Sequence, residues 1–211
     1  MKCNKTYLLG ELTFLFILIP GLLYFDIPGF IKAGFVLTGI AYVIRTAIKN
    51  HLFTRRSFYS LPLKSYWKTI AIRFILLIIF STILMYFSDY EKLFIVVKTN
   101  PVFWLVVSIF YSILSVYPQE FLYRSFFFSR YEILFQNPYL LIALNALVFS
   151  FAHILFKNLF VLIITLVGGV IFAITFFRTR SLLLTSVEHA LYGSWLFTVG
   201  MGEMLAFPMP E

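Results

Sequence analysis

The sequence predicts an all-α protein, a bundle of about seven or eight helices that crosses a membrane several times. Of its 211 residues, 61% are hydrophobic and only 12% are charged, and the mean hydropathy is +0.93. Soluble globular domains contain roughly 45–50% apolar and about 25% charged residues. Because apolar runs follow one another from end to end, a soluble domain with a single anchor is excluded. We expect one integral-membrane domain over residues 1–211, with its motif-bearing core at 101–200.

Seven apolar runs reach the length that a membrane-spanning helix requires, about 20 residues. Pro118 lies inside the fourth run, and we expect it to bend that helix just before Gln119. The same helix should continue past Arg124 toward Phe135. The seven expected spans are 7–25, 29–48, 69–88, 101–122, 138–156, 159–177 and 181–200.

The basic residues between the apolar runs predict the orientation in the membrane. If the N-terminus is cytoplasmic, thirteen of the 17 Lys and Arg residues fall on the cytoplasmic side, as the positive-inside rule requires. We therefore expect a multi-pass protein of the cell (inner) membrane. The net charge of +8 does not indicate a nucleic-acid partner, because the basic residues lie in short loops. Cys3 is the only cysteine, which excludes a disulfide within the chain and a cysteine metal cluster.

Ionisable side chains inside the apolar spans mark the candidate site, because charges in hydrocarbon are costly and indicate function. Glu120 and Arg124 are four residues apart, so one helix face presents both. His153 lies in the fifth run, with Phe149 one turn before it, and His189 lies in the seventh. Alone, each feature has a structural explanation, such as a hydrogen bond between helices or an interfacial ion pair. Because these ionisable residues lie on three separate spans, we expect them to converge at one site.

The chemistry that these residue types permit is of two kinds. A glutamate and a histidine are what general-base activation of a water molecule requires, and a second histidine could hold a developing oxyanion. Two histidines and one carboxylate also match a catalytic zinc site with an open position. The residue types alone do not decide between general-base catalysis and a catalytic zinc site. A serine nucleophile is disfavoured, because no serine lies in a G-x-S-x-G setting.

Three short motifs follow one another in the second half of the chain. They are Gln119-Glu120-Phe-Leu-Tyr-Arg124, Phe149-Ser-Phe-Ala-His153 and His189-Ala-Leu-Tyr-Gly193. Their order and separations resemble the CAAX-protease and bacteriocin-processing (CPBP) family of intramembrane proteases, which includes the Ras-converting endopeptidase. That family shows Glu-Glu-x-x-x-Arg, Phe-x-x-x-His and His-x-x-x-Asn in three helices. The resemblance covers roughly Val102 to Gly200.

The chain departs from the family pattern at two positions. Gln119 stands where the family has its first glutamate, usually assigned as the base that activates water, and a glutamine cannot accept a proton. Glu120 is then the working base of a variant branch, with Gln119 as hydrogen-bonding support. The alternatives are an introduced inactivating substitution and a non-catalytic family member. Gly193 stands where the family has asparagine, which removes one oxyanion donor, and Tyr192 or the Gln119 amide could replace it.

The resemblance implies a metal-independent endopeptidase without a cofactor, which hydrolyses a peptide bond of a membrane-associated peptide or protein. Glu120, held by Arg124, would polarise water together with His153, and His189 would stabilise the oxyanion. Gln119 would position water or substrate. The other supporting residues are Tyr123, Phe149 and Tyr192. One question stays open, because Arg124 lies at the inner end of its expected span and His153 toward the outer end of its own.

Other functions remain as alternatives. One is a zinc-dependent version of the same protease, and another is a non-catalytic membrane protein such as a bacteriocin-immunity factor or a scaffold. A proton-coupled transporter ranks lower, because no pair of broken spans indicates inverted repeats. The expected partners are the lipid bilayer and a membrane-associated substrate, without nucleic acid.

Overall fold

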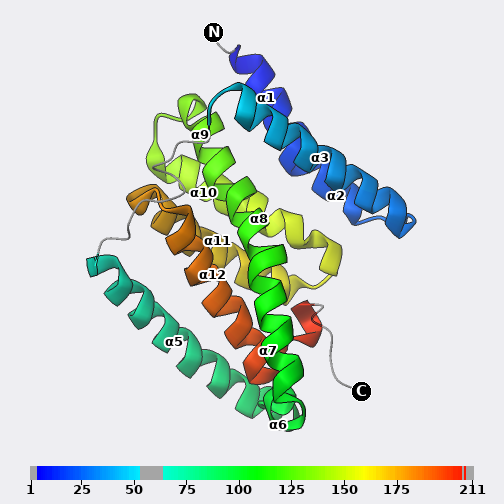
Figure 1. The fold of residues 1–211 in the computed structure, drawn as a ribbon, viewed down its shortest axis with the longest axis vertical. Helices are drawn as coiled ribbons and strands as arrows, with labels where there is room; N and C mark the ends of the chain where they lie inside the picture. Colours follow the sequence, from blue (N-terminus) through cyan, green and yellow to red (C-terminus); the bar gives the residue numbers. More distant parts are fainter. Residues whose placement is uncertain (1–3, 53–63, 206, 208–211) are drawn as a thin grey trace.

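A computed structural model describes residues 4–52, 64–205 and 207, and every regular element within these ranges is a helix. Figure 1 shows the N-terminal helices side by side at one edge of the bundle and α5 (Lys64–Ser88) at the opposite edge. The helices from α7 (Pro101–Phe110) to α12 (Leu182–Leu196) lie between them. The predicted all-α, multi-pass fold is confirmed.

Two helices joined by a short turn form the N-terminal edge. The first, Lys5–Leu23, consists of α1 (Lys5–Thr13), the π-helical η1 (Phe14–Leu18) and α2 (Ile19–Leu23), and the second is α3 (Gly29–Lys49). The Asn4 side chain caps the first helix by accepting a hydrogen bond from the Thr6 amide at 3.0 Å. In the turn, Asp26 accepts a hydrogen bond from Lys157 Nζ at 2.7 Å, and this contact lowers the pKa of the Asp26 carboxyl.

The opposite edge of the bundle is formed by α5, which exposes most of its large apolar side chains. Phe80 is 66% exposed and Phe87 is 81% exposed, as expected for a helix that faces lipid. Arg73 of the same helix points inward instead, and its guanidinium forms an ion pair with Glu188 in the bundle interior. The short helices η2 (Tyr90–Lys92) and α6 (Ile95–Thr99) then lead into the centre of the bundle.

The central span runs from Pro101 to Leu134, so the predicted continuation past Arg124 toward Phe135 is confirmed. Pro118 lies within this span, and the residues on both sides of it keep helical dihedral angles. A π-helical stretch, Tyr111–Val116, ends two residues before Pro118. Such wide turns accommodate irregularities in a helix. After α7 the elements are η3 (Tyr111–Val116), α8 (Tyr117–Glu120), η4 (Phe121–Phe126), α9 (Phe127–Tyr131) and η5 (Glu132–Leu134).

Three further helices complete the bundle behind the central span. Each begins with a side-chain cap that satisfies free amide groups of the first turn, supplied by Asn137, Asn158 and Ser181. Gly200 ends the last helix with a φ of 109°, a conformation that favours glycine. The elements are α10 (Pro138–Phe151), η6 (Ala152–Phe156), α11 (Leu159–Thr179), α12, η7 (Phe197–Met201) and η8 (Glu203–Leu205).

Six helices in the described residues are long and apolar enough to cross a membrane, against seven predicted spans. The seventh expected span, 181–200, forms α12 and η7 but is not among the six, and it carries Glu188 and His189. The orientation stays a prediction. Lys2, Arg55 and Arg56, which contribute to the charge asymmetry, lie outside the described residues. The six helices are Lys5–Leu23, Gly29–Lys49, Tyr66–Ser88, Pro101–Leu134, Pro138–Phe156 and Leu159–Thr179.

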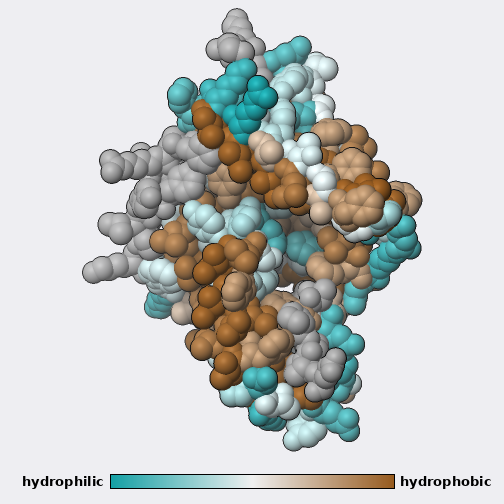
Figure 2. All heavy atoms as spheres, turned by 45° about the vertical axis from the view of Figure 1, so that its right-hand side comes forward, coloured by the Kyte–Doolittle hydropathy of each residue, from teal (hydrophilic) through white to brown (hydrophobic). Residues whose placement is uncertain are grey.

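The interior of the bundle holds ionisable groups, whereas the outer surface is apolar. The side chains of Glu120, Arg124 and Glu188 are completely buried, while Phe30 and Tyr139 are 77% and 81% exposed. Figure 2 shows apolar residues over much of one face, hydrophilic residues toward its top and bottom, and a central hollow in which hydrophilic residues are visible. Such a distribution suits a protein surrounded by lipid, in which charges require partners inside the fold.

Candidate active site

Glu120 lies at the centre of the candidate site, near the middle of the central span. Its carboxylate oxygen Oε2 is 3.3 Å from Nε of Arg124, four residues further along the same helix. The spacing puts both side chains on one helix face. The π-helical η4, which contains Arg124, begins directly after Glu120, and π-helical turns often occur at functional sites. An ionised Glu120 therefore has its counter-charge on its own helix.

His189 of α12 meets Glu120 from the other side. Its Nδ1 is 2.9 Å from Oε1 of Glu120, and the two residues are 69 positions apart in the sequence. An ionised carboxylate only accepts hydrogen bonds, so Nδ1 carries the proton and donates. Nε2 of His189 is then left as an acceptor. The carboxylate thus sets both the orientation and the tautomer of the imidazole.

Aromatic rings hold the His189 side chain in this position. Phe172 is stacked on the imidazole, with ring centroids 4.5 Å apart and an interplanar angle of 22°. Phe149 meets it edge-on at 5.7 Å. The Tyr111 hydroxyl lies 3.3 Å from Nε2. The imidazole is therefore fixed on two faces and at both nitrogens, which is the preorganisation that a catalytic base requires.

Arg124 is held by a second hydrogen-bonded group, Asn145 of α10. Nη1 of Arg124 donates to Oδ1 of Asn145 at 2.7 Å, and Nδ2 of Asn145 donates to the Tyr123 carbonyl at 2.6 Å. The guanidinium also lies 4.7 Å from the centre of the Phe149 ring, a cation–π contact. Sequence reasoning missed Asn145, although a buried amide inside the apolar run 138–156 is a signal that could have identified it.

Three atoms at the centre of the site keep unused hydrogen-bonding capacity. Glu120 Oε2, Arg124 Nε and Arg124 Nη2 are buried and have no hydrogen-bond partner among the described residues, although Oε2 and Nε face each other at 3.3 Å in the ion pair. Buried polar atoms nearly always have partners in folded proteins. One acceptor and two donors at the same location are suited to a water molecule or a polar group of a substrate.

His153 lies beside this group and does not join it by a hydrogen bond. Its Nδ1 is 2.8 Å from the Phe149 carbonyl oxygen, and its ring is 4.9 Å from the Phe149 ring. Within the described residues, no hydrogen bond links His153 to Glu120 or to His189. Phe149 contacts both imidazoles and so separates the two histidines.

Gln119 and Tyr123 flank Glu120 on the central span. Gln119 Nε2 donates to Ser115 Oγ at 2.8 Å, one turn earlier in the same helix. The Tyr123 ring is buried, edge-on to Phe149 at 5.3 Å. Gln119 therefore directs its amide donor along its own helix, and Tyr123 supports the ring on which Arg124 lies.

A second buried cluster surrounds Glu188, the residue before His189. Glu188 accepts hydrogen bonds from Arg73 at 3.1 Å, from Tyr192 at 3.0 Å and from Thr175 at 2.5 Å. The Tyr192 hydroxyl is thus directed to Glu188. These bonds connect α5, α11 and α12, which indicates a structural role for the cluster.

Arg124 lies well before the end of the central helix. The helix ends at Leu134, ten residues after Arg124. At about 1.5 Å per residue this is roughly 15 Å along the helix axis. At this position Asn145 of α10 bonds Arg124 and His189 of α12 bonds Glu120.

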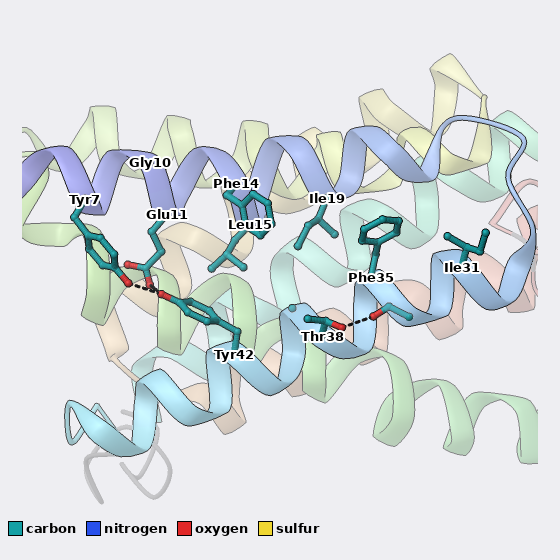
Figure 3. A pocket seen from close by; sticks show the side chains of 12 residues that line it. Tyr7, Gly10, Glu11, Phe14, Leu15, Ile19, Ile31, Phe35, Thr38 and Tyr42 are labelled. Carbon is teal, nitrogen blue, oxygen red and sulfur yellow. Dashed lines mark hydrogen bonds between the residues drawn. The ribbon is translucent and has the colours of Figure 1, made fainter.

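A separate cavity lies between the two N-terminal helices (Figure 3). It encloses about 790 Å³, and at one end Tyr7, Tyr42 and Glu11 form a chain of hydrogen bonds. Arg130 of the central span closes this chain with a contact of 2.9 Å to Glu11. The lining includes none of the residues in the three motifs.

The donor set that the zinc alternative requires is not assembled. Among the described residues, no group of three or more His, Cys, Asp or Glu side chains has the arrangement to hold a metal ion.

A buried glutamate, arginine and histidine lie at the centre of this multi-pass helical bundle. The family model described as type II CAAX prenyl endopeptidase Rce1-like matches residues 100–195, which supports a protein of the membrane-protease kind. This segment contains all three motifs, so the resemblance that they indicate is confirmed for it. No curated protein and no solved structure gives a significant match.

Proposed function

We propose that this protein is an intramembrane endopeptidase, which hydrolyses a peptide bond of a membrane-associated peptide or protein through a water molecule activated by Glu120 and His189. The observation that carries the proposal is the hydrogen bond of 2.9 Å between the buried Glu120 carboxylate and His189 Nδ1. The family match over residues 100–195 supports the protease kind.

The chemistry follows from the tautomer of His189. Nε2 takes a proton from water, and the water oxygen forms a bond to the carbonyl carbon of the substrate. The carbonyl oxygen becomes an oxyanion in the tetrahedral intermediate. The C–N bond then breaks, and the leaving amine receives the proton from Nε2. Glu120 stabilises the imidazolium between the two steps, as a buried carboxylate does in other hydrolases.

Arg124 maintains the charge on Glu120 in this scheme. Its guanidinium is 3.3 Å from Oε2 and is anchored by Asn145 at 2.7 Å. A carboxylate without a counter-ion at this depth would be strongly disfavoured. This assignment differs from the prediction that Glu120 acts with His153, because the structure pairs Glu120 with His189 instead. His153 remains a supporting residue at the Phe149 ring.

The substrate class follows from the location of the site. The scissile bond must reach a group roughly 15 Å inside the helix end, so the substrate is membrane-embedded or membrane-anchored. The family description names a CAAX prenyl endopeptidase, and a prenylated, membrane-anchored protein is one member of the proposed substrate class.

The test uses the purified protein in lipid nanodiscs and a pool of synthetic single-span peptides, incubated in water enriched in ¹⁸O. We expect mass spectrometry to detect new C-termini that carry ¹⁸O. Glu120→Gln and His189→Ala should reduce the rate by at least about 100-fold. Cleavage by both variants at the wild-type rate would overturn the proposal. Inhibition by 1,10-phenanthroline, restored by added zinc, would favour the zinc-dependent alternative.

The non-catalytic alternative has one observation in its favour, which is Gln119 in place of the family glutamate. If wild type releases no product in the nanodisc assay and Gln119→Glu does, the native chain is a non-catalytic family member. If wild type and Gln119→Glu both release product, Glu120 and His189 suffice for cleavage without a glutamate at position 119.

A further inference from the structure

Tyr111 is a partly buried residue whose hydroxyl lies beside the free nitrogen of His189, and none of the sequence motifs includes it. It begins the π-helical η3 of the central span, two turns before Gln119. Its hydroxyl is 3.3 Å from His189 Nε2. Because Nε2 is the acceptor in the tautomer that Glu120 imposes, the hydroxyl donates to it. The bond is long for an O–H donor, so it is weak and easily exchanged for a better acceptor.

Gly193 provides the space for this hydroxyl. A Cβ atom built at position 193 would overlap the Tyr111 hydroxyl and lie 2.6 Å from its ring carbon Cε1. Gly193 lies inside α12 with helical geometry, so no positive φ requires a glycine there. The requirement is steric. Since position 193 is one turn after His189, the Tyr111 hydroxyl occupies the place in which a side chain at 193 would lie beside the imidazole.

The Tyr111 ring is held in this position by its surroundings. Phe207 packs against it with ring centroids 4.8 Å apart, and Phe207 is itself stacked on Phe197 at 4.6 Å. The Tyr111 ring also meets the His189 imidazole edge-on at 6.3 Å. A donor held on a packed helix in this way needs little reorganisation during a reaction.

We infer that Tyr111 is a further catalytic residue, whose hydroxyl donates a hydrogen bond to the substrate carbonyl oxygen as that oxygen becomes negative. The inference rests on the proposed function. Water that gives its proton to Nε2 displaces the weak Tyr111 bond, and the hydroxyl turns to the oxyanion that forms next to it. Tyr192 and Gln119, which sequence reasoning proposed as donors, are bonded to Glu188 and Ser115.

Tyr111→Phe tests the inference, because it removes the hydroxyl and keeps the ring against Gly193 and Phe207. We expect kcat for a cleaved single-span peptide to fall on the order of 100-fold, as when one oxyanion donor is removed, with KM nearly unchanged. Tyr131→Phe is the matched control. It removes another buried tyrosine hydroxyl of the same span, one that has no hydrogen-bond partner among the described residues. Its kcat should equal that of wild type.

A pair of variants separates the donor from the packing. Tyr111→Ala with Gly193→Asn places an amide donor in the vacated space beside His189. This double variant should recover at least about tenfold in kcat over Tyr111→Ala, corresponding to roughly 1.4 kcal/mol in the barrier. Gly193→Asn alone should lower kcat, because its side chain overlaps Tyr111. Thermal unfolding in detergent checks that each variant is folded.

The outcomes distinguish the two proposals. If Tyr111→Phe keeps the wild-type kcat while Glu120→Gln is inactive, the role of Tyr111 is wrong and the proposed function stands. If Tyr111→Phe loses activity and the amide of the double variant restores none, Tyr111 is a packing residue and the inference is wrong. If wild type and Glu120→Gln cleave equally or not at all, the proposed function fails and the inference fails with it.

Discussion

His189 and Glu120 join the last helix of the bundle to the middle of the central span through a hydrogen bond of 2.9 Å between Nδ1 and Oε1. Both side chains are buried, and the second carboxylate oxygen faces Arg124 at 3.3 Å. The candidate site is thus an ion pair, Glu120 with Arg124, hydrogen-bonded to a histidine inside an apolar bundle. A separate ion pair in the bundle interior joins Arg73 to Glu188 at 3.1 Å, and the roles of the two groups can be separated by mutation.

Replacing Arg124 should destabilise the protein strongly, because the variant leaves the Glu120 charge buried without its closest counter-ion. For Arg124→Met we expect a loss of about 3–5 kcal/mol in the free energy of unfolding. Adding Glu120→Gln should recover part of this loss, since the uncompensated charge is gone. Unfolding in mixed micelles measures both. Equal stability of Arg124→Met and the double variant would show that Glu120 is not charged in the folded protein.

Replacing Arg73 should affect stability and leave the chemistry intact. Glu188 keeps hydrogen bonds from Thr175 and Tyr192 when Arg73 is removed, so we expect Arg73→Met to cost about 1–3 kcal/mol. The cleavage rate per folded molecule should equal that of wild type. A large loss of kcat in a fully folded Arg73→Met sample would place the Glu188 cluster in the mechanism.

Gly169 should not tolerate a larger residue, because α10 and α11 are closest there. A Cβ at Gly169 would lie 3.1 Å from both Cα and the carbonyl oxygen of Ala146, which are backbone atoms that cannot move aside alone. Gly169→Val should cost about 1–3 kcal/mol in the free energy of unfolding. Gly10→Ala is the control, since a Cβ at Gly10 meets no atom within 4 Å. Equal unfolding temperatures for the two variants would contradict the close approach.

The contact between Asp26 and Lys157 should give a small pH dependence outside the membrane-spanning segments. The Lys157 hydrogen bond holds the pKa of Asp26 below 3.8, its ordinary value. The stabilisation is therefore complete above that value and is lost as the pH falls through the lower pKa of the folded state. Wild type should be slightly more stable than Asp26→Asn at pH 7, and the difference should shrink as the pH falls below 3.8. A difference that grows toward low pH would contradict the direction of the shift.

Much of the architecture could be predicted because it depends on local properties of the sequence. Run length and composition predict the spanning helices, and the four-residue spacing of Glu120 and Arg124 predicts their contact on one helix face. The seventh span was the weakest prediction, since Glu188, His189 and their polar neighbours make it the most polar of the runs. The polar side chains of Glu188 and His189 are tolerated there because the rest of the bundle surrounds them.

The sequence by itself determined the membrane class, the helix positions and the residues with reactive groups, because hydrophobicity and helical spacing are properties of neighbouring residues. Only the tertiary structure decided that Glu120 pairs with His189 while His153 binds the Phe149 carbonyl. It also placed the Tyr111 hydroxyl next to His189, although the two residues are 78 positions apart in the sequence. The reason is physical. Such pairings depend on how helices rotate and approach one another, and that is set by packing across the whole bundle, as at Gly193.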